Sequence, residues 1–237
     1  MRKLFLKFPK ITGPLRSFYN MYFGEKEIKA IFKLLEEYKN QYIFFDIGAN
    51  YGIYTFLFSK NSLFTYVFEP IEECIEYIRR GCIYKNISLV NKAVSNSEKE
   101  QILSIPIDNG NKVFGKSSFD KSFKKQEQRK VPSTKLDNYI KETEKFNEKV
   151  IFIKIDVEGH ENKVVDGGID LIKNRKAILL IEIEQRHNKE FNYVFQKLSN
   201  LNFHVCVYKN KKFVDIDTDF NLEEAMRDNN NFIFKNY

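Results

Sequence analysis

The chain has 237 residues, 43% of them hydrophobic and 15% aromatic, a composition that supports one folded α/β domain and argues against intrinsic disorder. Its net charge of +7 would suit nucleic acid, a membrane surface or an anionic substrate, but the lysines are scattered and are most simply a solvated surface. Three cysteines without CxxC spacing argue against a disulfide framework and a zinc site, and predict a reduced, cytoplasmic protein.

We expect residues 1–40 to form an N-terminal arm and helix, and residues 41–237 to form the main domain. Residues 1–23 are basic and rich in Phe and Tyr, but Lys7 and Pro9 interrupt the apolar run, so it is too short for a signal peptide. No stretch reaches the roughly 18 apolar residues of a membrane span. We expect the arm to pack on the domain or on a partner subunit, with a peripheral membrane contact as the weaker alternative. Residues 25–39 have the period of an amphipathic helix.

The most informative segment follows this helix. An apolar strand, residues 42–46, ends in Asp46, turns through Gly48 and Gly52 and continues as a helix over residues 52–60. A second strand, residues 65–68, ends in Glu69. A glycine turn after one strand and a carboxylate after the next build a nucleoside pocket at the carboxyl edge of a parallel sheet, where the carboxylate binds both ribose hydroxyls.

The spacing of this turn departs from the dinucleotide fingerprint G-x-G-x-x-G. The pattern is Asp46-x-Gly48-x-Asn50-x-Gly52, which has an acid at the strand end and no cation in the turn. An acid there repels phosphate but suits an ammonium or a sulfonium, and S-adenosylmethionine carries both. A nicotinamide-dependent oxidoreductase and a non-catalytic nucleoside-binding module remain as alternatives of a different class.

The rest of the chain alternates strands and helices, which predicts a doubly wound, mostly parallel sheet with an antiparallel terminal hairpin. Residues 108–130 are polar and without periodicity, and we expect a long mobile loop there. The other predicted elements are a helix at 72–84, strands at 87–94 and 101–106 (an added edge), a helix at 136–145, a strand at 150–156, a helix at 161–173 weakened by Gly167-Gly168, a strand at 177–184, a helix at 192–201, a hairpin at 204–208 and 212–216, and a strand at 232–234.

Three blocks carry a family resemblance: Phe45–Gly52, Val67–Pro70 and the sequence Phe-Ile-Lys-Ile-Asp-Val-Glu-Gly-His-Glu at residues 152–161. They resemble the signature blocks of the FkbM family of S-adenosylmethionine-dependent O-methyltransferases. Smaller elements at 134–137 and 179–182 also resemble the family, so that roughly residues 40–185 are covered. The resemblance implies the Rossmann-like class I methyltransferase fold, with seven strands of which the seventh is antiparallel, and S-adenosyl-L-methionine as cofactor.

We expect the cofactor to be held by residues at the ends of the strands. Asp46 would contact the methionine amino group or cap the next helix, Asn50 and Thr55 would contact the methionine carboxylate, and the resemblance implies that Ala93 and Val94 flank the adenine. The full predicted set is Asp46, Gly48, Ala49, Asn50, Gly52, Thr55, Glu69, Pro70, Ala93, Val94 and Asp156.

The candidate reaction site is Asp156-x-Glu158-x-His160, after the fourth strand of the parallel series. Methyl transfer to a hydroxyl needs alignment and removal of a proton. His160 is the first choice for the base because a histidine titrates near neutrality. Asp156 is the alternative base or a group that orients the substrate, and Glu158 would support the histidine or instead hold the turn through backbone N–H groups. Glu184 and His187 would lie near the acceptor.

Asp156, Glu158 and His160 could ligate a divalent metal, and so could Glu182 and Glu184, but the spacing is not diagnostic, and we predict no metal site.

The expected partner is a small molecule. The resemblance favours a sugar, either nucleotide-activated or part of a bacterial surface glycan, or a secondary metabolite; Lys124, Lys125 and Arg129 would then bind a diphosphate. A nucleic-acid methyltransferase is the alternative. Asp156-Val-Glu-Gly replaces the Asn/Asp-Pro-Pro-Tyr/Phe motif of base N-methylation, so we predict no nucleic acid. A homo-oligomer is left open.

Overall fold

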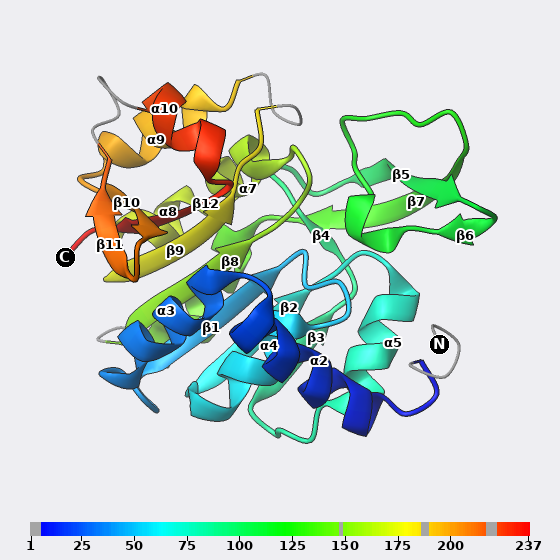
Figure 1. The fold of residues 1–237 in the computed structure, drawn as a ribbon, viewed down its shortest axis with the longest axis horizontal. Coiled ribbons are helices and arrows are strands. Elements are labelled where there is room, and N and C mark those ends of the chain that lie inside the picture. Colours follow the sequence, from blue (N-terminus) through cyan, green and yellow to red (C-terminus); the bar gives the residue numbers. More distant parts are fainter. Residues whose placement is uncertain (1–5, 147–148, 186–189, 217–221) are drawn as a thin grey trace.

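The computed structural model describes residues 6–146, 149–185, 190–216 and 222–237. Its centre is an eight-stranded sheet in the order β11-β10-β12-β9-β8-β1-β2-β3 (Figure 1). Five strands are parallel: β1 (Tyr42–Ile47), β2 (Phe64–Phe68), β3 (Ile87–Val90), β8 (Val150–Ile155) and β9 (Ala177–Glu182). The antiparallel part comprises β12 (Asn231–Lys235) beside β9, and the hairpin of β10 (His204–Lys209) and β11 (Lys212–Asp215).

Helices cover both faces of this sheet. On one face lie α3 (Lys26–Glu36), α4 (Ile53–Phe58) and α5 (Glu72–Gly81), and α2 (Pro9–Phe23) packs outside them. On the other face lie α7 (Glu161–Gly167), α8 (Ile169–Lys173), α9 (Asn192–Ser199) and α10 (Leu222–Asp228). Short turns of helix complete the chain: η1 (Ser59–Asn61), η2 (Phe114–Lys116), η3 (Leu136–Tyr139), α6 (Ile140–Thr143) and η4 (Glu144–Phe146).

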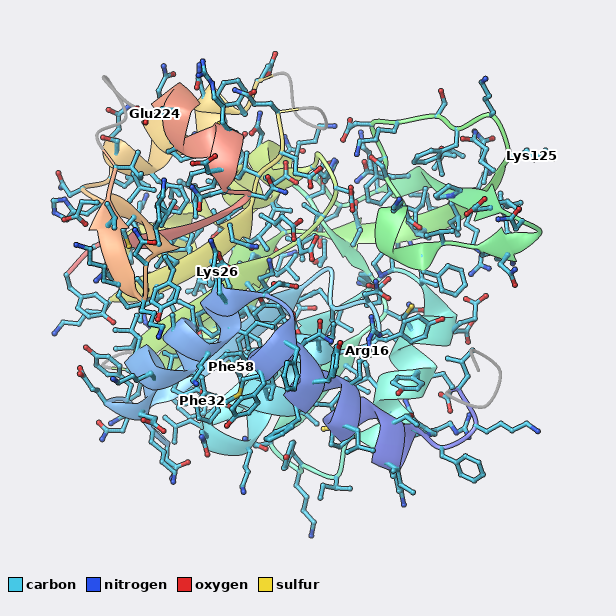
Figure 2. The ribbon with its side chains drawn as sticks, in the orientation of Figure 1. Arg16, Lys26, Phe32, Phe58, Lys125 and Glu224 are labelled. Atoms are coloured by element: carbon cyan, nitrogen blue, oxygen red, sulfur yellow. The ribbon has the colours of Figure 1, made fainter. Side chains whose placement is uncertain are left out.

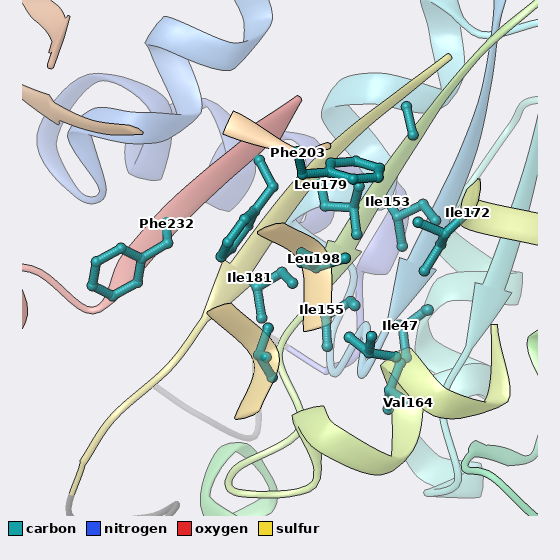
Figure 3. Close-up of a cluster of buried hydrophobic side chains, with 14 of the residues drawn as sticks. Ile47, Ile153, Ile155, Val164, Ile172, Leu179, Ile181, Leu198, Phe203 and Phe232 are labelled. Atoms are coloured by element: carbon teal, nitrogen blue, oxygen red, sulfur yellow. The ribbon is translucent and has the colours of Figure 1, made fainter. Parts of the chain in front are cut away.

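The strand sequences explain the two layers, because side chains alternate between the faces of a strand. In β1, Ile43, Phe45 and Ile47 belong to the core under α7, α8 and α9, whereas Tyr42 and Phe44 belong to the core under α3 and α4. Every residue of β1 and β8 is buried, as expected for central parallel strands. Figure 3 shows the first of these cores, in which Ile47, Ile155 and Val164 lie close to the edge that carries the site.

A second, smaller sheet lies beside the first, in the order β4-β7-β5-β6 (Figure 1). Its strands are β4 (Ala93–Val94), β5 (Glu100–Asp108), β6 (Asn111–Lys112) and β7 (Gln126–Thr134). Three expectations are therefore wrong. The strand at 87–94 is divided between the two sheets, the strand at 101–106 is not an edge of the main sheet, and residues 108–130 are not one long loop. Residues 126–130 of β7 are polar because much of that strand is exposed, so they lack the hydrophobic signal of a strand.

The doubly wound, mostly parallel architecture is as predicted, but the count of seven strands is not confirmed, because β11 adds an eighth to the described sheet. The first crossover helix and the Gly167-Gly168 interruption also lie where the sequence placed them. Two helices were not foreseen as helices, α2 in the N-terminal arm and α10 near the end. His187 lies outside the described residues. Among the described residues, no helix combines the length and the apolar character needed to cross a bilayer.

Candidate functional site

The site lies where the chain order of the sheet reverses, between β1 and β8, at the carboxyl ends of the strands. Open α/β sheets bind ligands at such a switch point. The two loops that follow these strands touch, and the Asp156 N–H donates to the Ile47 carbonyl at 3.0 Å. Gly48 has φ +76°, and a Cβ atom there would lie 1.9 Å from the Asp156 carbonyl oxygen. Only glycine fits this close approach of the two loops.

A cavity opens at this edge and encloses about 610 Å³ of space free of protein atoms, part of it continuous with solvent. Seven of the predicted cofactor residues line it: Gly48, Asn50, Glu69, Pro70, Ala93, Val94 and Asp156. Glu158 and His160 line it as well, whereas Asp46, Ala49, Gly52, Thr55 and Glu184 do not.

Glu69 projects from the end of β2 and is only 4% exposed. Its Oε2 accepts the Asn50 N–H at 2.7 Å and its Oε1 accepts the Ile71 N–H at 2.8 Å. Burial raises the pKa of Glu69 to about 7 despite these two hydrogen bonds. A carboxylate oxygen has two lone pairs, so each oxygen can accept a further hydrogen bond from a ligand hydroxyl.

Asp46 and Thr55 lie behind the glycine turn and are both buried. The Thr55 hydroxyl donates to Asp46 Oδ2 at 2.5 Å, which fastens β1 to α4. The N-cap residue of α4, Gly52, has no side chain to cap the helix, and the Asp46 carboxylate also receives a backbone hydrogen bond from Thr55 in the first turn, which is consistent with the capping alternative. Burial raises the pKa of Asp46 to about 6. Direct contact of Asp46 or Thr55 with the cofactor stays a prediction.

His160 is buried between two partners. Its Nε2 lies 3.0 Å from Ser95 Oγ, and its Nδ1 lies 2.9 Å from Asp120 Oδ2. The hydrogen bond from His160 lowers the pKa of Asp120. Because both ring nitrogens are engaged, His160 fastens β4 and the segment before β7 to the start of α7. It would have to give up one partner to accept a proton from an acceptor.

Glu158 sits in a sharp turn after β8, with φ +52°, a conformation that non-glycine residues rarely adopt. Its Oε2 accepts Lys121 Nζ at 3.3 Å, and its carbonyl accepts the Ser118 hydroxyl at 2.8 Å. The backbone N–H of Gly159 donates instead to Glu161 Oε1, at 2.8 Å. The carboxylate that holds this turn through its backbone is therefore Glu161, while Glu158 points to Lys121.

A second, smaller hollow adjoins the cavity. It encloses about 180 Å³, and five carboxylates line it: Asp156, Glu158, Glu161, Glu182 and Glu184. Glu182 and Glu184 thus face the same space, as strand alternation predicted, and Asn230 Nδ2 donates to Glu184 at 2.9 Å. Within the described ranges, no group of three or more side chains is placed to hold a metal ion.

Sequence reasoning gave no role to Lys154, which is 1% exposed near the carboxyl end of β8. Its Nζ lies 3.2 Å from Asn231 Oδ1, 3.7 Å from Glu182 Oε2 and 5.1 Å from the centre of the Tyr54 ring. Burial opposes the charge, but Asp156, Glu182, Glu25 and Asp46 outweigh it and raise the pKa of Lys154. A lysine within an otherwise apolar strand was the available signal.

Replacing Lys154 with methionine is expected to lower the free energy of unfolding by about 3 kcal/mol or more, because it leaves buried carboxylates without their cation. Their pKa values then rise further, so the folded protein binds more protons than the unfolded chain, and stability falls more steeply as pH rises from about 5 to about 8. Denaturant unfolding at both ends of this range measures the effect. The control Lys173→Met removes a 45% exposed side chain and should change stability by less than about 0.5 kcal/mol. Equal losses in both variants would contradict a role for Lys154 in neutralising the site.

The segment between β6 and β7 was expected to contribute cations, but the residues of it that line the cavity were not predicted. Phe114, Gly115, Ser117 and Phe119 line the cavity. Asp120 anchors the segment on α7, where its Oδ1 accepts Lys163 Nζ at 3.2 Å, in addition to the contact with His160.

The cations that were expected to bind a diphosphate do not line the cavity. Lys125 lies at the outer end of the second sheet (Figure 2). Arg129 pairs with Glu73, 2.5 Å from its Oε2, and with Glu127. Lys124, Lys125 and Arg129 therefore do not line the cavity as a cationic group, whereas Lys121 of the same segment pairs with Glu158 at its wall.

Residues 46–205 match the family model described as the methyltransferase FkbM domain, which is more than half of the 237 residues. No curated protein matches the sequence significantly. Among similar solved structures is the FkbM methyltransferase from Methylobacillus flagellatus KT, with 14% identity and a TM-score of 0.48, covering 81% of this chain and 42% of that chain. The chain therefore spans less than half the length of that protein.

Two further structures are similar at low identity. They are the precorrin-6y C5,15-methyltransferase from Geobacter metallireducens GS-15 (11% identity, TM-score 0.42, 89% of this chain and 86% of that chain) and a putative S-adenosylmethionine-dependent methyltransferase from Listeria monocytogenes (9%, 0.43, 88% and 95%). The match to a methyltransferase family rules against the alternative that the protein is a nicotinamide-dependent oxidoreductase. The chain belongs to the FkbM family of methyltransferases, and its cofactor is S-adenosylmethionine.

Proposed function

We propose that this protein methylates a hydroxyl group of a sugar. The observation that carries the proposal is the hollow lined by five carboxylates, which shares Asp156 and Glu158 with the cofactor cavity. A sugar at the mouth of that hollow would present hydroxyl donors to these carboxylate acceptors, next to the place where the methyl group is delivered.

The residues of the cavity fit the cofactor. Glu69 has lone pairs for the ribose hydroxyls, and Ile71, Val94 and Leu103 provide apolar walls for the adenine. The cavity is lined by the backbone at Gly48 and by the carboxylates Glu69, Asp156 and Glu158, and no lysine or arginine is among its lining residues. Such surroundings suit a cationic ligand. When bound, S-adenosylmethionine supplies an electrophilic methyl carbon on a sulfonium.

The charge of the hollow favours one class of acceptor over another. Carboxylates accept hydrogen bonds from neutral hydroxyl groups but repel the phosphates of nucleic acid. This supports a sugar that presents its hydroxyl groups to the hollow, whether it belongs to a glycan or is carried by a nucleotide whose phosphates stay away from the carboxylates. It argues against a nucleic-acid acceptor.

Asp156 is the better candidate for the base than His160. Its carboxylate lines both the cavity and the hollow, and burial raises its pKa toward the range in which a base is effective at neutral pH. The neighbouring Lys154 opposes that rise and keeps the group ionisable. Both nitrogens of His160, in contrast, are engaged by Ser95 and Asp120. In this assignment His160 is a positioning residue.

Replacing Asp156 with asparagine is expected to lower kcat by about 10²-fold or more with little change in the KM of the acceptor, since the loss of a general base acts on the chemical step. The assay is methyl transfer to a panel of free, nucleotide-linked and oligomeric sugars, with the methylated atom located by NMR. In His160→Asn the side-chain amide can still make one of the two hydrogen bonds that the His160 ring makes, so this variant should lose less activity than Asp156→Asn. A greater loss in His160→Asn, in protein with an unchanged melting temperature, would return the role of base to His160. Methyl transfer to nitrogen or carbon would overturn the proposal.

A further inference from the structure

Helix α2 packs on the domain through its small residues. Pro9, Gly13 and Ser17 are buried at one face of the helix, against α4 and α5. A Cβ atom on Gly13 would lie 2.5 Å from the Phe56 ring, so glycine allows the two helices to approach closely. The expectation that the arm packs on the domain holds for this face only.

The opposite face of α2 is apolar and exposed. Successive residues of a helix are about 100° apart, which places the large side chains on one side and the small buried ones on the other. Seven of the eleven large hydrophobic side chains that are exposed in the described structure belong to this helix or to the residue before it, with exposures from 49% to 76%. They form the α2 apolar band: Phe8, Ile11, Leu15, Phe18, Tyr19, Tyr22 and Phe23.

The band is a contiguous surface. The rings of Phe18 and Tyr22 are 4.6 Å apart, and those of Tyr19 and Phe23 are 5.3 Å apart. Single exposed hydrophobic residues are ordinary on a protein surface, but contiguous apolar patches mark an interaction site.

Basic residues accompany the band, and acidic residues are absent from its part of the sequence. Residues 1–24 contain Arg2, Lys3, Lys7, Lys10 and Arg16, and no Asp or Glu. From α3, Lys29 Nζ lies 5.2 Å from the centre of the Tyr22 ring. From α5, the Arg80 side chain donates to the Lys7 carbonyl at 3.4 Å. A partner that is both apolar and anionic therefore suits this surface better than a cationic one.

This charge distinguishes two occupants. A second copy of the chain that met the band across a two-fold axis would present the same segment, in which residues 1–24 carry five basic and no acidic residues. An anionic bilayer offers an apolar interior beneath negative headgroups, and aromatic residues flanked by Lys and Arg are typical of helices that lie in that interface. We propose that α2 docks this protein on an anionic membrane surface, with the α2 apolar band inserted among the headgroups.

Docking in this way would bring the site to the bilayer. Leu15, Arg16 and Tyr19 of α2 line a groove whose other wall includes Asn50 and Phe114. Those two residues also line the cofactor cavity. The groove leads from the band to the glycine turn, so acceptors held at a membrane lie within reach of the site. The docking itself does not depend on the identity of the acceptor.

Flotation of the full chain with lipid vesicles tests the proposal. We expect the protein to float with vesicles that contain phosphatidylglycerol and to remain unbound with pure phosphatidylcholine, and the bound fraction to fall as salt rises from about 0.1 M to about 0.5 M. The triple variant Ile11→Ser, Phe18→Ser, Phe23→Ser should bind at least about tenfold more weakly. The double variant Ile83→Ser, Ile102→Ser, which removes exposed apolar side chains elsewhere, is the matched control and should bind as the wild type does.

Melting temperature and S-adenosylmethionine affinity, both expected to be unchanged, show that the triple variant is folded. Failure of the wild type to bind phosphatidylglycerol vesicles would overturn the proposal, and so would equal binding to neutral vesicles. A dimer by light scattering that the triple variant dissociates, without vesicle binding, would instead identify the band as a contact between copies. Loss of methyl transfer with intact vesicle binding would count against the proposed function alone.

Discussion

Replacing Glu69 with alanine is expected to weaken S-adenosylmethionine binding by about a hundredfold or more. We infer that the buried Glu69 carboxylate accepts the two ribose hydroxyls, since the backbone N–H groups of Asn50 and Ile71 hold it at the wall of the cavity. Hydrogen bonds to a charged group contribute about 1.5–3 kcal/mol each, so the loss of two gives at least this factor. Calorimetric titration measures it directly.

The same carboxylate makes binding pH-dependent. Its pKa is raised to about 7 by burial in the free protein, so lowering the pH below that value protonates it and removes acceptor capacity. We expect affinity to rise with pH through about 7, and Glu69→Gln to bind weakly with a flat profile. Stability runs in the opposite direction. Because the folded protein holds this proton at a pH where the unfolded chain has lost it, the contribution of Glu69 to stability declines as pH rises from about 4.5 to about 7.

The control for this experiment is Glu72→Ala, which removes an exposed carboxylate at the start of α5, three residues away. Its affinity should match that of the wild type. If Glu69→Ala bound within about threefold of the wild type, the carboxylate at the end of β2 would not be the ribose ligand, and the position of the adenosine in the cavity would have to be revised.

The parts of the site that could be predicted from the sequence are those set by local signals. An apolar strand, a glycine turn and a carboxylate after the next strand suffice to place Gly48, Glu69 and Asp156 at one edge, since parallel strands end together. The turn at Gly48 needs φ +76°, and glycine is a direct sign of such a position.

The parts that could not be predicted depend on contacts between distant segments. The two partners of His160, Ser95 and Asp120, are 65 and 40 residues away, so a histidine that resembled a free base in the sequence is held at both nitrogens. β7 is polar along its first half because it pairs with β5 at an exposed edge, and hydrophobic periodicity cannot detect a strand of that kind. The exposed face of α2 is as apolar as the buried face of an ordinary helix, so its sequence does not reveal that it is exposed. The packing of Gly13 against Phe56 shows that the small residues form the inward face.

Among substitutions that add a single methyl group at the site, Gly48→Ala is expected to cause the largest loss in the free energy of unfolding. The substitution places a side chain at φ +76° and drives its Cβ to 1.9 Å from the Asp156 carbonyl oxygen, far inside van der Waals contact. Backbone strain accounts for about 1 kcal/mol, and separation of the β1 and β8 loops raises the total to at least about 3 kcal/mol. Denaturant unfolding of the purified variant measures the loss.

Gly110→Ala separates the two contributions. Gly110 has nearly the same backbone conformation, φ +75°, but nothing lies within 4 Å of the position that a Cβ would take. This variant should therefore lose only about 1 kcal/mol and keep its cofactor affinity. If both variants lost the same free energy of unfolding, backbone strain alone would explain the glycine at position 48. The two loops would then be able to move apart at little cost. A much larger loss at Gly48, together with weakened S-adenosylmethionine binding in whatever fraction folds, would mean that the rigid contact of these two loops is what keeps the cavity in its binding geometry.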